Sequence, residues 1–213
     1  MKVCINLWCI FITLILIFCG SCKKDEPPLK QPEINPVITP QGGVFITNEG
    51  NYSWGNASVS YYKNDSGIVT EDIFKMANNR PLGDVCQSME IYNGKAYLVV
   101  NNSGKIEVVN PKDFKSIAVI NGFVYPRYFL QVNNLKAYVT DINSNSIAVV
   151  NLSSNTITKQ ISCPGWTEEL ILVNDKAFIT NVRKEYVYIV NTATDILEDS
   201  IKVGFAPSSI RKD

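Results

Sequence analysis

The chain has 213 residues, 20 basic and 20 acidic side chains, no histidine, and 46% hydrophobic residues. The zero net charge argues against a nucleic-acid-binding protein, which needs a basic surface. The lack of histidine excludes Ser-His-Asp and Cys-His catalysis and histidine-ligated metals, and the apolar content is sufficient for a packed core.

Residues 1–21 are predicted to be a lipoprotein signal peptide. Lys2 precedes an apolar run over 5–18, and small residues at 20–21 lead to Cys22. The run is shorter than the roughly 20 apolar residues of a membrane span, so a transmembrane anchor is the less favoured alternative. The small residues before the cysteine resemble the lipobox of bacterial lipoproteins, which implies that Cys22 is lipidated and anchors the chain to a membrane.

Residues 22–40 are predicted to be the lipidated cysteine and a Pro-rich tether. The prolines favour a semi-rigid, extended spacer that holds a domain away from the membrane. The charged cluster at 23–26 resembles the surface-export signal of Bacteroides-type lipoproteins. The expected location is therefore the cell outer membrane, with the protein lipid-anchored and exposed at the surface.

Residues 41–213 carry an internal repeat. Its two marks are a Lys-Ala pair that opens an apolar run and an asparagine that closes the next run. Successive copies of both marks are 41 and 40 residues apart, at Lys95, Lys136 and Lys176 and at Asn110, Asn151 and Asn191. Two independent marks with one period indicate a repeat architecture.

Each repeat reads as four short strands rich in β-branched and aromatic residues. In one repeat the expected strands are 127–132, 136–141, 146–151 and 157–161, separated by Asn- and Ser-rich turns. Four strands per 40–45 residues are typical of a propeller blade. The predicted fold is all-β, a β-propeller of about four four-stranded blades, with one short helical turn over 71–79. A β-sandwich of irregular strands is the alternative, which the strict period disfavours.

Three strands carry a closely similar tetrapeptide, at 45–48 (FITN), 138–141 (YVTD) and 178–181 (FITN). They resemble the repeat of YVTN-type, YncE-like β-propellers, a resemblance that covers residues 43–213. Further stretches are similar to a set of surface lipoproteins from Bacteroides-type bacteria that includes BtuG-type cobalamin-binding proteins; these stretches are 48–51, 54–56, 82–85, 99–106 and 165–168.

The resemblance implies seven blades, which need about 290 residues, whereas about 170 follow the tether and suffice for four. The ring is therefore expected to be incomplete. Residues 204–213 begin a further innermost strand, and truncation is favoured over the alternative that this segment closes a small ring against residues 44–48.

Aligning the repeats places Gln87, Arg127, Glu168 and Ser208 at one position, the start of the innermost strand. In a propeller this position rings the mouth of the central channel, on the same face as the loops between second and third strands. Aromatic and amide groups in such a concavity favour a small-molecule or glycan site. The predicted ligand-binding residues are Asn51, Trp54, Gln87, Asn102, Tyr125, Arg127, Asp141, Trp166, Glu168 and Arg183. The alternative is that these residues satisfy loop backbone and solvate the mouth.

No cofactor or metal is expected, since neither a calcium-loop motif nor a glycine-rich phosphate loop is present. Cys86 and Cys163 are expected to be free thiols, because their strands lie far apart. Glu49, Glu168 and Asp141 are the mouth carboxylates, and they form no recognisable catalytic pair, so no enzyme activity is expected.

The favoured function is a surface-exposed binding module that captures a small solute for a TonB-dependent outer-membrane transporter. The expected ligand is a corrinoid, such as cobalamin, or a glycan. A propeller for surface adhesion or partner binding is the main alternative, and a lactonase-type propeller enzyme is the less favoured one.

Overall fold

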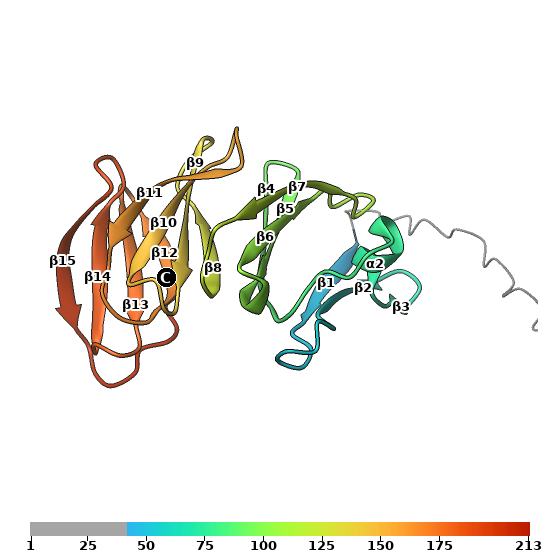
Figure 1. Ribbon diagram of the computed structural model, residues 1–213, viewed down its shortest axis with the longest axis horizontal. Coiled ribbons are helices and arrows are strands. Elements are labelled where there is room, and N and C mark those ends of the chain that lie inside the picture. The colour runs from blue at the N-terminus through green and yellow to red at the C-terminus, as the bar shows by residue number, and fades with distance from the viewer. Residues whose placement is uncertain (1–41) are drawn as a thin grey trace, which may run out of the picture. The chain divides into compact units, whose positions relative to one another are not determined.

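The computed structural model describes residues 42–213, so the predicted signal peptide, the lipidated Cys22 and the tether lie outside the described residues (Figure 1). Within the described range the strands form four antiparallel sheets, each built from consecutive strands. No helix in this range is long and apolar enough to cross a membrane. We call the sheets blades 1 to 4 in chain order.

The elements of blades 1 and 2 are β1 (Gly43–Asn48), β2 (Ser58–Lys63), β3 (Ile68–Thr70), the helix α2 (Ile73–Asn78), β4 (Cys86–Tyr92), β5 (Lys95–Val100), a 3-10 turn (Asn101–Ser103), β6 (Lys105–Val109) and β7 (Ser116–Asn121). Those of blades 3 and 4 are β8 (Pro126–Gln131), β9 (Lys136–Asp141), β10 (Ser146–Asn151), β11 (Thr156–Ser162), β12 (Thr167–Val173), β13 (Lys176–Asn181), β14 (Tyr186–Asn191) and β15 (Ile196–Lys202).

The middle strands of each blade read as nearly continuous apolar runs because both of their faces are buried. In β9, Ala137 and Val139 pack in the core against blade 2. Tyr138, between them in sequence, packs in the core against blade 4 together with Val149. Alternate side chains thus serve two different cores, and each core lies between neighbouring blades.

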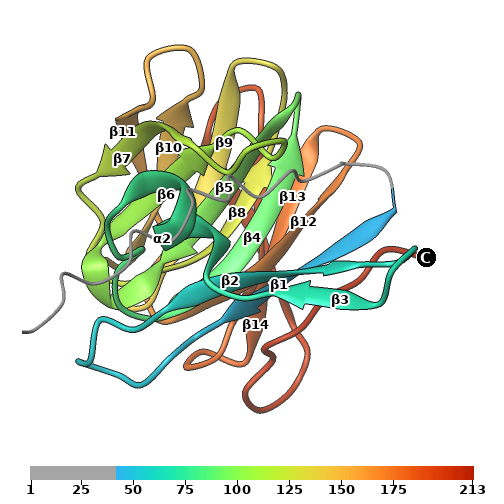
Figure 2. The same ribbon diagram turned by 90° about the vertical axis from the view of Figure 1, so that its right-hand side faces the viewer.

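The first strands of blades 2, 3 and 4 lie side by side. β4 contacts β8, and β8 contacts β12, so these three are the innermost strands (Figure 2). The fourth strands β7, β11 and β15 lie on the outside, where they make fewer contacts with one another. This order is that of a propeller, with the innermost strands around a central channel.

The propeller prediction is confirmed, and the expected strands of the repeat over 127–161 agree with β8 to β11 to within one residue. The helical turn expected over 71–79 is α2. Two of the predicted turns are also confirmed: Asn145 and Asn155 adopt positive φ between strands, a conformation that asparagine tolerates better than most residues.

Two expectations about the blades need correction. Blade 1 has three strands in place of the four expected, with the order β1-β2-β3. Residues 204–213, expected to begin an innermost strand, have no assigned strand, and the ring is open in the described range. The physical reason is pairing: a strand is defined by its backbone ladder, whereas residues 209–211 are joined to β12 through the side chain of Glu169.

Candidate functional site

Each innermost strand of blades 2 to 4 begins with a β-bulge. The pairing register shifts between Cys86 and Ser88 in β4, between Pro126 and Phe129 in β8, and between Thr167 and Leu170 in β12. A bulge leaves a residue out of the ladder and turns its side chain away from the regular alternation. The aligned polar residues Gln87, Arg127 and Glu168 lie in these three bulges.

Arg127 joins the three bulges into one network. Its Nε donates to both carboxylate oxygens of Glu168, at 3.0 and 3.1 Å, and its Nη2 donates to Oε1 at 2.5 Å. Its Nη1 donates to Gln87 Oε1. The Arg127 and Glu168 side chains are only 18% and 7% exposed, so this forked, charge-assisted pairing is shielded from water. Side chains some 40 residues apart in sequence thus meet across neighbouring strands.

Trp166 and Arg183 extend this network toward solvent. The indole Nε1 of Trp166 donates to Glu168 Oε2 at 2.5 Å. The guanidinium of Arg183 lies 5.6 Å from the centroid of the Trp166 ring, within cation–π range. Trp166 is half-buried and Arg183 is exposed. We call Gln87, Arg127, Glu168, Trp166 and Arg183 the mouth network.

Trp54 lies on a loop between β1 and β2 that is fixed at its base and open at its tip. The Ser53 amide donates to Asp84 Oδ2 at 2.8 Å, and Asn102 Nδ2 donates to the same oxygen at 2.6 Å. The Asn51 amide donates to Asn56 Oδ1 at 2.8 Å, which closes the turn. The Trp54 side chain is 74% exposed, so it does not fold back into blade 1.

Tyr52, on the same loop, reaches the segment that leads into blade 3. A side-chain hydrogen bond with Tyr125 raises the pKa of Tyr52 above its usual value. The loop of blade 1 and the start of blade 3 therefore meet on one face. Tyr52 is 62% exposed and Tyr125 is half-buried, so both rings present surface to solvent.

Asp141 supports the loop beside Tyr125. Its Oδ2 accepts from the amides of Val124 and Tyr125 at 2.9 and 3.0 Å. Its Oδ1 accepts from the amides of Asn143 and Ser144 at 3.0 and 3.2 Å. The residue is 2% exposed, and both of its carboxylate oxygens accept hydrogen bonds from loop backbone. Asp141 therefore supports the loop, which is the alternative to ligand contact for these polar residues.

The structure thus brings together Gln87, Arg127, Trp166, Glu168 and Arg183, and it places Trp54, Asn102 and Tyr125 around the loop held by Asp84. Asn51 is an exposed turn residue, Asp141 is a loop support, and Ser208 is exposed. The sequence predicts a contact loop over 49–55, the insertion in the first repeat, which includes Tyr52, but it does not single out Tyr52 or Asp84. Neither residue has a counterpart in the other repeats that would have revealed its contacts.

Within residues 42–213, the titratable groups outside the mouth network form no metal or thiolate centre. The described residues contain no group of three or more Cys, Asp and Glu side chains placed to hold a metal ion. Cys86 and Cys163 are free and buried. Burial raises the pKa of both thiols to about 12, so both are protonated at neutral pH.

Comparison with known proteins agrees with this architecture. The sequence profile of a family described as "Domain of unknown function (DUF5074)" matches residues 42–212. No curated protein sequence is detectably similar to the chain.

Several solved structures share the fold at low sequence identity. The β-propeller domain of Myceliophteria thermophila Cps50 (Swd1) is 10% identical with a TM-score of 0.60, over 74% of this chain and 53% of that one. The WD40 β-propeller domain of Doa1 is 13% identical with a TM-score of 0.57, over 76% of this chain and 51% of that one. A quinonprotein alcohol dehydrogenase-like protein from Bacteroides thetaiotaomicron is 16% identical with a TM-score of 0.57, over 71% and 36%. The chain therefore spans between about a third and a half of the propellers that it resembles.

Proposed function

The chain belongs to the DUF5074 family, and from that premise we propose that it is a lipid-anchored, surface-exposed binding module of the outer membrane. It captures a small solute at the channel mouth and passes it to a TonB-dependent transporter. Cobalamin is the first candidate solute, on the resemblance to BtuG-type lipoproteins, and a glycan is the second.

The observation that carries the proposal is the mouth network. Propeller folding requires apolar residues at the cores between blades, but it does not require a Gln-Arg-Glu chain across three innermost strands. That chain fixes the edge of the Trp166 indole through Glu168 at 2.5 Å, while Arg183 lies at the ring face. A half-buried aromatic ring held in place loses little conformational freedom when a ligand stacks on it.

The surroundings suit a large, polar ligand with flat portions. Tyr52, Trp54 and Tyr125 present aromatic surface to solvent. Asn102 and Gln87 add partly exposed amide groups, and Arg183 adds an exposed cation. Corrinoids and glycans both combine apolar faces with many amide or hydroxyl groups, and such ligands bind between aromatic side chains and a few fixed polar groups.

Calorimetric titration tests the proposal. The full chain, purified in a mild detergent, is titrated with cyanocobalamin and, separately, with a panel of oligosaccharides. We expect saturable binding of one class, lost at least tenfold in affinity in Trp166→Ala and retained in Leu135→Ala. Leu135 is a matched control because it is an apolar residue, 63% exposed, in the turn between β8 and β9.

A folded chain that binds neither class would contradict solute capture and would favour the partner-binding alternative. Circular dichroism of each sample shows whether the chain is folded. Turnover of a lactone in the same preparation would support the enzyme alternative.

A further inference from the structure

The acceptor atoms of the mouth network are already occupied by internal hydrogen bonds. Both carboxylate oxygens of Glu168 accept, from the Arg127 guanidinium and from the Trp166 indole, and the Glu168 side chain is 7% exposed. Gln87 Oε1 accepts from Arg127 Nη1. A ligand that approaches these side chains therefore meets N–H donors and aromatic surface, and it finds no free carboxylate among them.

Arg183 is a cation without an anionic partner among residues 42–213. It is exposed, and the contact that its guanidinium makes is with the face of the Trp166 ring, at 5.6 Å from the centroid. Glu185, two positions along the chain, pairs with Lys202 at 3.7 Å instead. A guanidinium over an aromatic ring keeps its N–H groups free for an oxygen anion, because the cation–π contact uses no hydrogen-bond donor.

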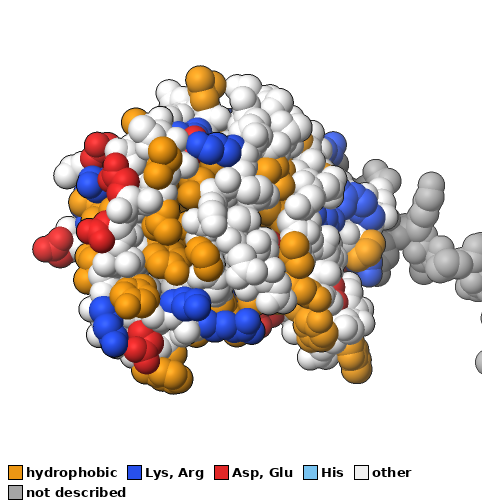
Figure 3. Space-filling model, turned by 60° about the vertical axis from the view of Figure 1, so that its left-hand side comes forward, with side chains coloured by type: hydrophobic (Ala, Val, Ile, Leu, Met, Phe, Trp, Pro, Cys, Tyr) orange, Lys and Arg blue, Asp and Glu red, His pale blue; other side chains and the backbone are white. Residues whose placement is uncertain are grey.

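The turn that carries Arg183 does not need this side chain in order to fold. It joins β13 to β14, and the Lys184 amide closes it by donating to the Asn181 carbonyl at 3.2 Å. Arg183 and Lys184 are both exposed. Figure 3 shows basic side chains gathered along the lower part of the surface, at the blade ends where this turn lies in Figure 1. The turn therefore adds positive charge at the mouth that the fold itself does not use.

None of the three carboxylates predicted at the mouth pairs with Arg183. Glu168 is paired with Arg127, and Asp141 is 2% exposed with both oxygens occupied by loop amides. Glu49 is exposed, but it belongs to the loop of blade 1, whereas Arg183 belongs to blade 4. The exposed charge beside Trp166 is therefore positive, and such a site favours an anionic ligand.

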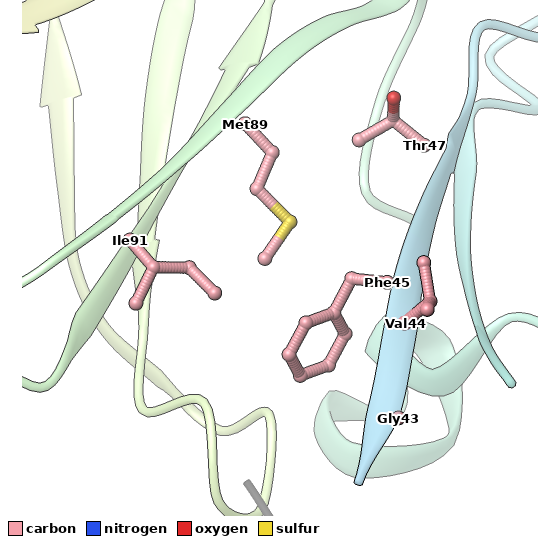
Figure 4. A pocket seen from close by; sticks show the side chains of 6 residues that line it. All are labelled: Gly43, Val44, Phe45, Thr47, Met89 and Ile91. Atoms are coloured by element: carbon pink, nitrogen blue, oxygen red, sulfur yellow. The ribbon is translucent and has the colours of Figure 1, made fainter. Parts of the chain in front are cut away.

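The groove between β1 and β4 offers no comparable partner for an anion. It has a volume of about 400 Å³, and Figure 4 shows that its lining is mainly apolar. The residues that line it are Gly43, Val44, Phe45, Thr47, Met89 and Ile91. No charged side chain is among them, so an anion bound there would lose its hydration without gaining an ion pair.

The channel beyond the mouth favours the opposite charge. A cavity of about 430 Å³ is bounded there by β4, β8 and β12, and its lining includes Glu90, Glu169 and Arg211. Arg211 pairs with Glu169, which leaves Glu90 without an ion-pair partner among the described residues. An anionic group is therefore favoured beside Trp166 and disfavoured deeper in the channel.

We propose that the ligand carries an anionic group, a carboxylate or a phosphate, which the Arg183 guanidinium binds beside the Trp166 ring. The planar fork of a guanidinium matches the paired oxygens of either group. Arg127 and Glu168 act as positioning residues, because they hold the indole over which Arg183 lies. The inference rests on the proposed function, since it names the chemistry of the ligand at that same site.

Calorimetry with paired ligands tests the inference on the full chain in a mild detergent. The first pair is cyanocobalamin and dicyanocobinamide, which lacks the phosphate-bearing nucleotide. The second pair is an oligogalacturonide and its methyl ester, in which the carboxylates are neutralised. We expect the anionic member of one pair to bind about tenfold more tightly than its neutral counterpart, as a charge-assisted hydrogen bond would provide. This preference should weaken as the salt concentration rises, and the pair that shows it identifies the source of the anion.

Two variants of the same turn locate the contact. Arg183→Gln removes the charge over the ring, and Lys184→Gln is the matched control that removes an equal charge one residue away. In Arg183→Gln we expect the preference for the anionic member to fall below about twofold, with little change in affinity for the neutral member. Lys184→Gln should keep the preference, and circular dichroism checks that both variants are folded.

Equal affinity for the charged and neutral members, with binding still dependent on Trp166, would overturn the inference and leave the proposed function intact. A preference that survives Arg183→Gln, or that is lost equally in Lys184→Gln, would also overturn it, because the anion would then be attracted elsewhere or by net charge alone. A folded chain that binds no member of either pair would contradict the proposed function and the inference together.

Discussion

Two Arg–Glu pairs of similar geometry occupy different regions of this propeller. Glu107, in the middle of blade 2, has a fully buried side chain that contacts Arg80 at 2.5 Å and Lys105 at 3.0 Å, and it accepts from the Ser116 hydroxyl at 2.5 Å. Glu168 pairs with Arg127 at 2.5 Å, and it also accepts a hydrogen bond from the Trp166 indole. The exposed guanidinium of Arg183 lies over the Trp166 ring.

The difference lies in what surrounds each carboxylate. The partners of Glu107 come from β6, β7 and the segment after α2, and they complete a network on one blade and its neighbour. The partners of Glu168 are Arg127 of β8 and Trp166, which directly precedes β12 and has its ring near the surface. Arg127 in turn connects Glu168 to Gln87 of β4. A buried ion pair is weak evidence for stabilisation by itself, so its surroundings must indicate whether it serves the fold or a ligand.

The largest expected effect is at the Glu107 pair. Glu107→Ala leaves Arg80 and Lys105 close together without their shared anion, and we expect the free energy of unfolding to fall by about 3–5 kcal/mol. Urea unfolding followed by circular dichroism measures the change. Glu185→Ala is the control, since Glu185 is 41% exposed and pairs with Lys202 at 3.7 Å; its effect should be below about 1 kcal/mol. Equal effects would show that the buried pair has no special structural role.

The same pair gives a pH dependence of stability. Burial raises the pKa of Glu107, but hydrogen bonds from Arg80, Ser116 and Lys105 outweigh burial and hold the pKa below its usual value. A carboxyl whose pKa is lowered by folding stabilises the folded state above its unfolded pKa of about 4.3, and this contribution is lost as pH falls through the lower folded value. Urea midpoints from pH 6 to pH 3 should fall more steeply for the unaltered chain than for Glu107→Gln. Parallel curves would contradict this assignment.

The mouth pair should give a smaller effect on stability and a local change in structure. Arg127→Met leaves Glu168 with Trp166 as its remaining partner, and we expect the free energy of unfolding to fall by about 2 kcal/mol, the worth of hydrogen bonds to a charged group. The released indole should show a shift in Trp fluorescence. Trp166→Phe in the same background identifies the emitting residue, and an unchanged spectrum would mean that Arg127 does not position the ring.

Much of this fold follows from the sequence. The 40–41-residue spacing and the nearly continuous apolar runs predict the middle strands of blades 2 to 4, because these strands bury both faces between neighbouring blades. The same spacing predicts that Gln87, Arg127 and Glu168 meet, since equivalent residues of successive repeats lie on adjacent strands.

The remaining contacts could not be predicted from spacing. The loop that carries Tyr52 and Trp54 is an insertion in the first repeat, so no other repeat reveals that Asp84 anchors it or that Tyr125 meets it. Asp141 resembles the other polar loop residues in sequence, and only its four amide contacts show that it supports the backbone.

The smallest expected effect is at the loop anchor. Asp84→Asn weakens the bonds from the Ser53 amide and Asn102, and we expect the free energy of unfolding to change by less than about 1 kcal/mol. Hydrogen exchange at the Ser53 amide should accelerate, while amides of β5 and β9 keep their protection. Unchanged exchange at Ser53 would show that the loop is fixed by other contacts.

The Glu107 pair stabilises the fold, whereas we propose that the Glu168 pair supports ligand binding, and one comparison of two variants tests this difference most directly. Affinity for the solute identified by calorimetry is measured for Trp166→Ala and Arg80→Ala, with the free energy of unfolding determined on the same samples. We predict that Trp166→Ala loses binding at least tenfold with a small change in stability, and that Arg80→Ala loses stability with unchanged affinity. The reverse pattern, or equal loss of affinity in both variants, would contradict the central claim.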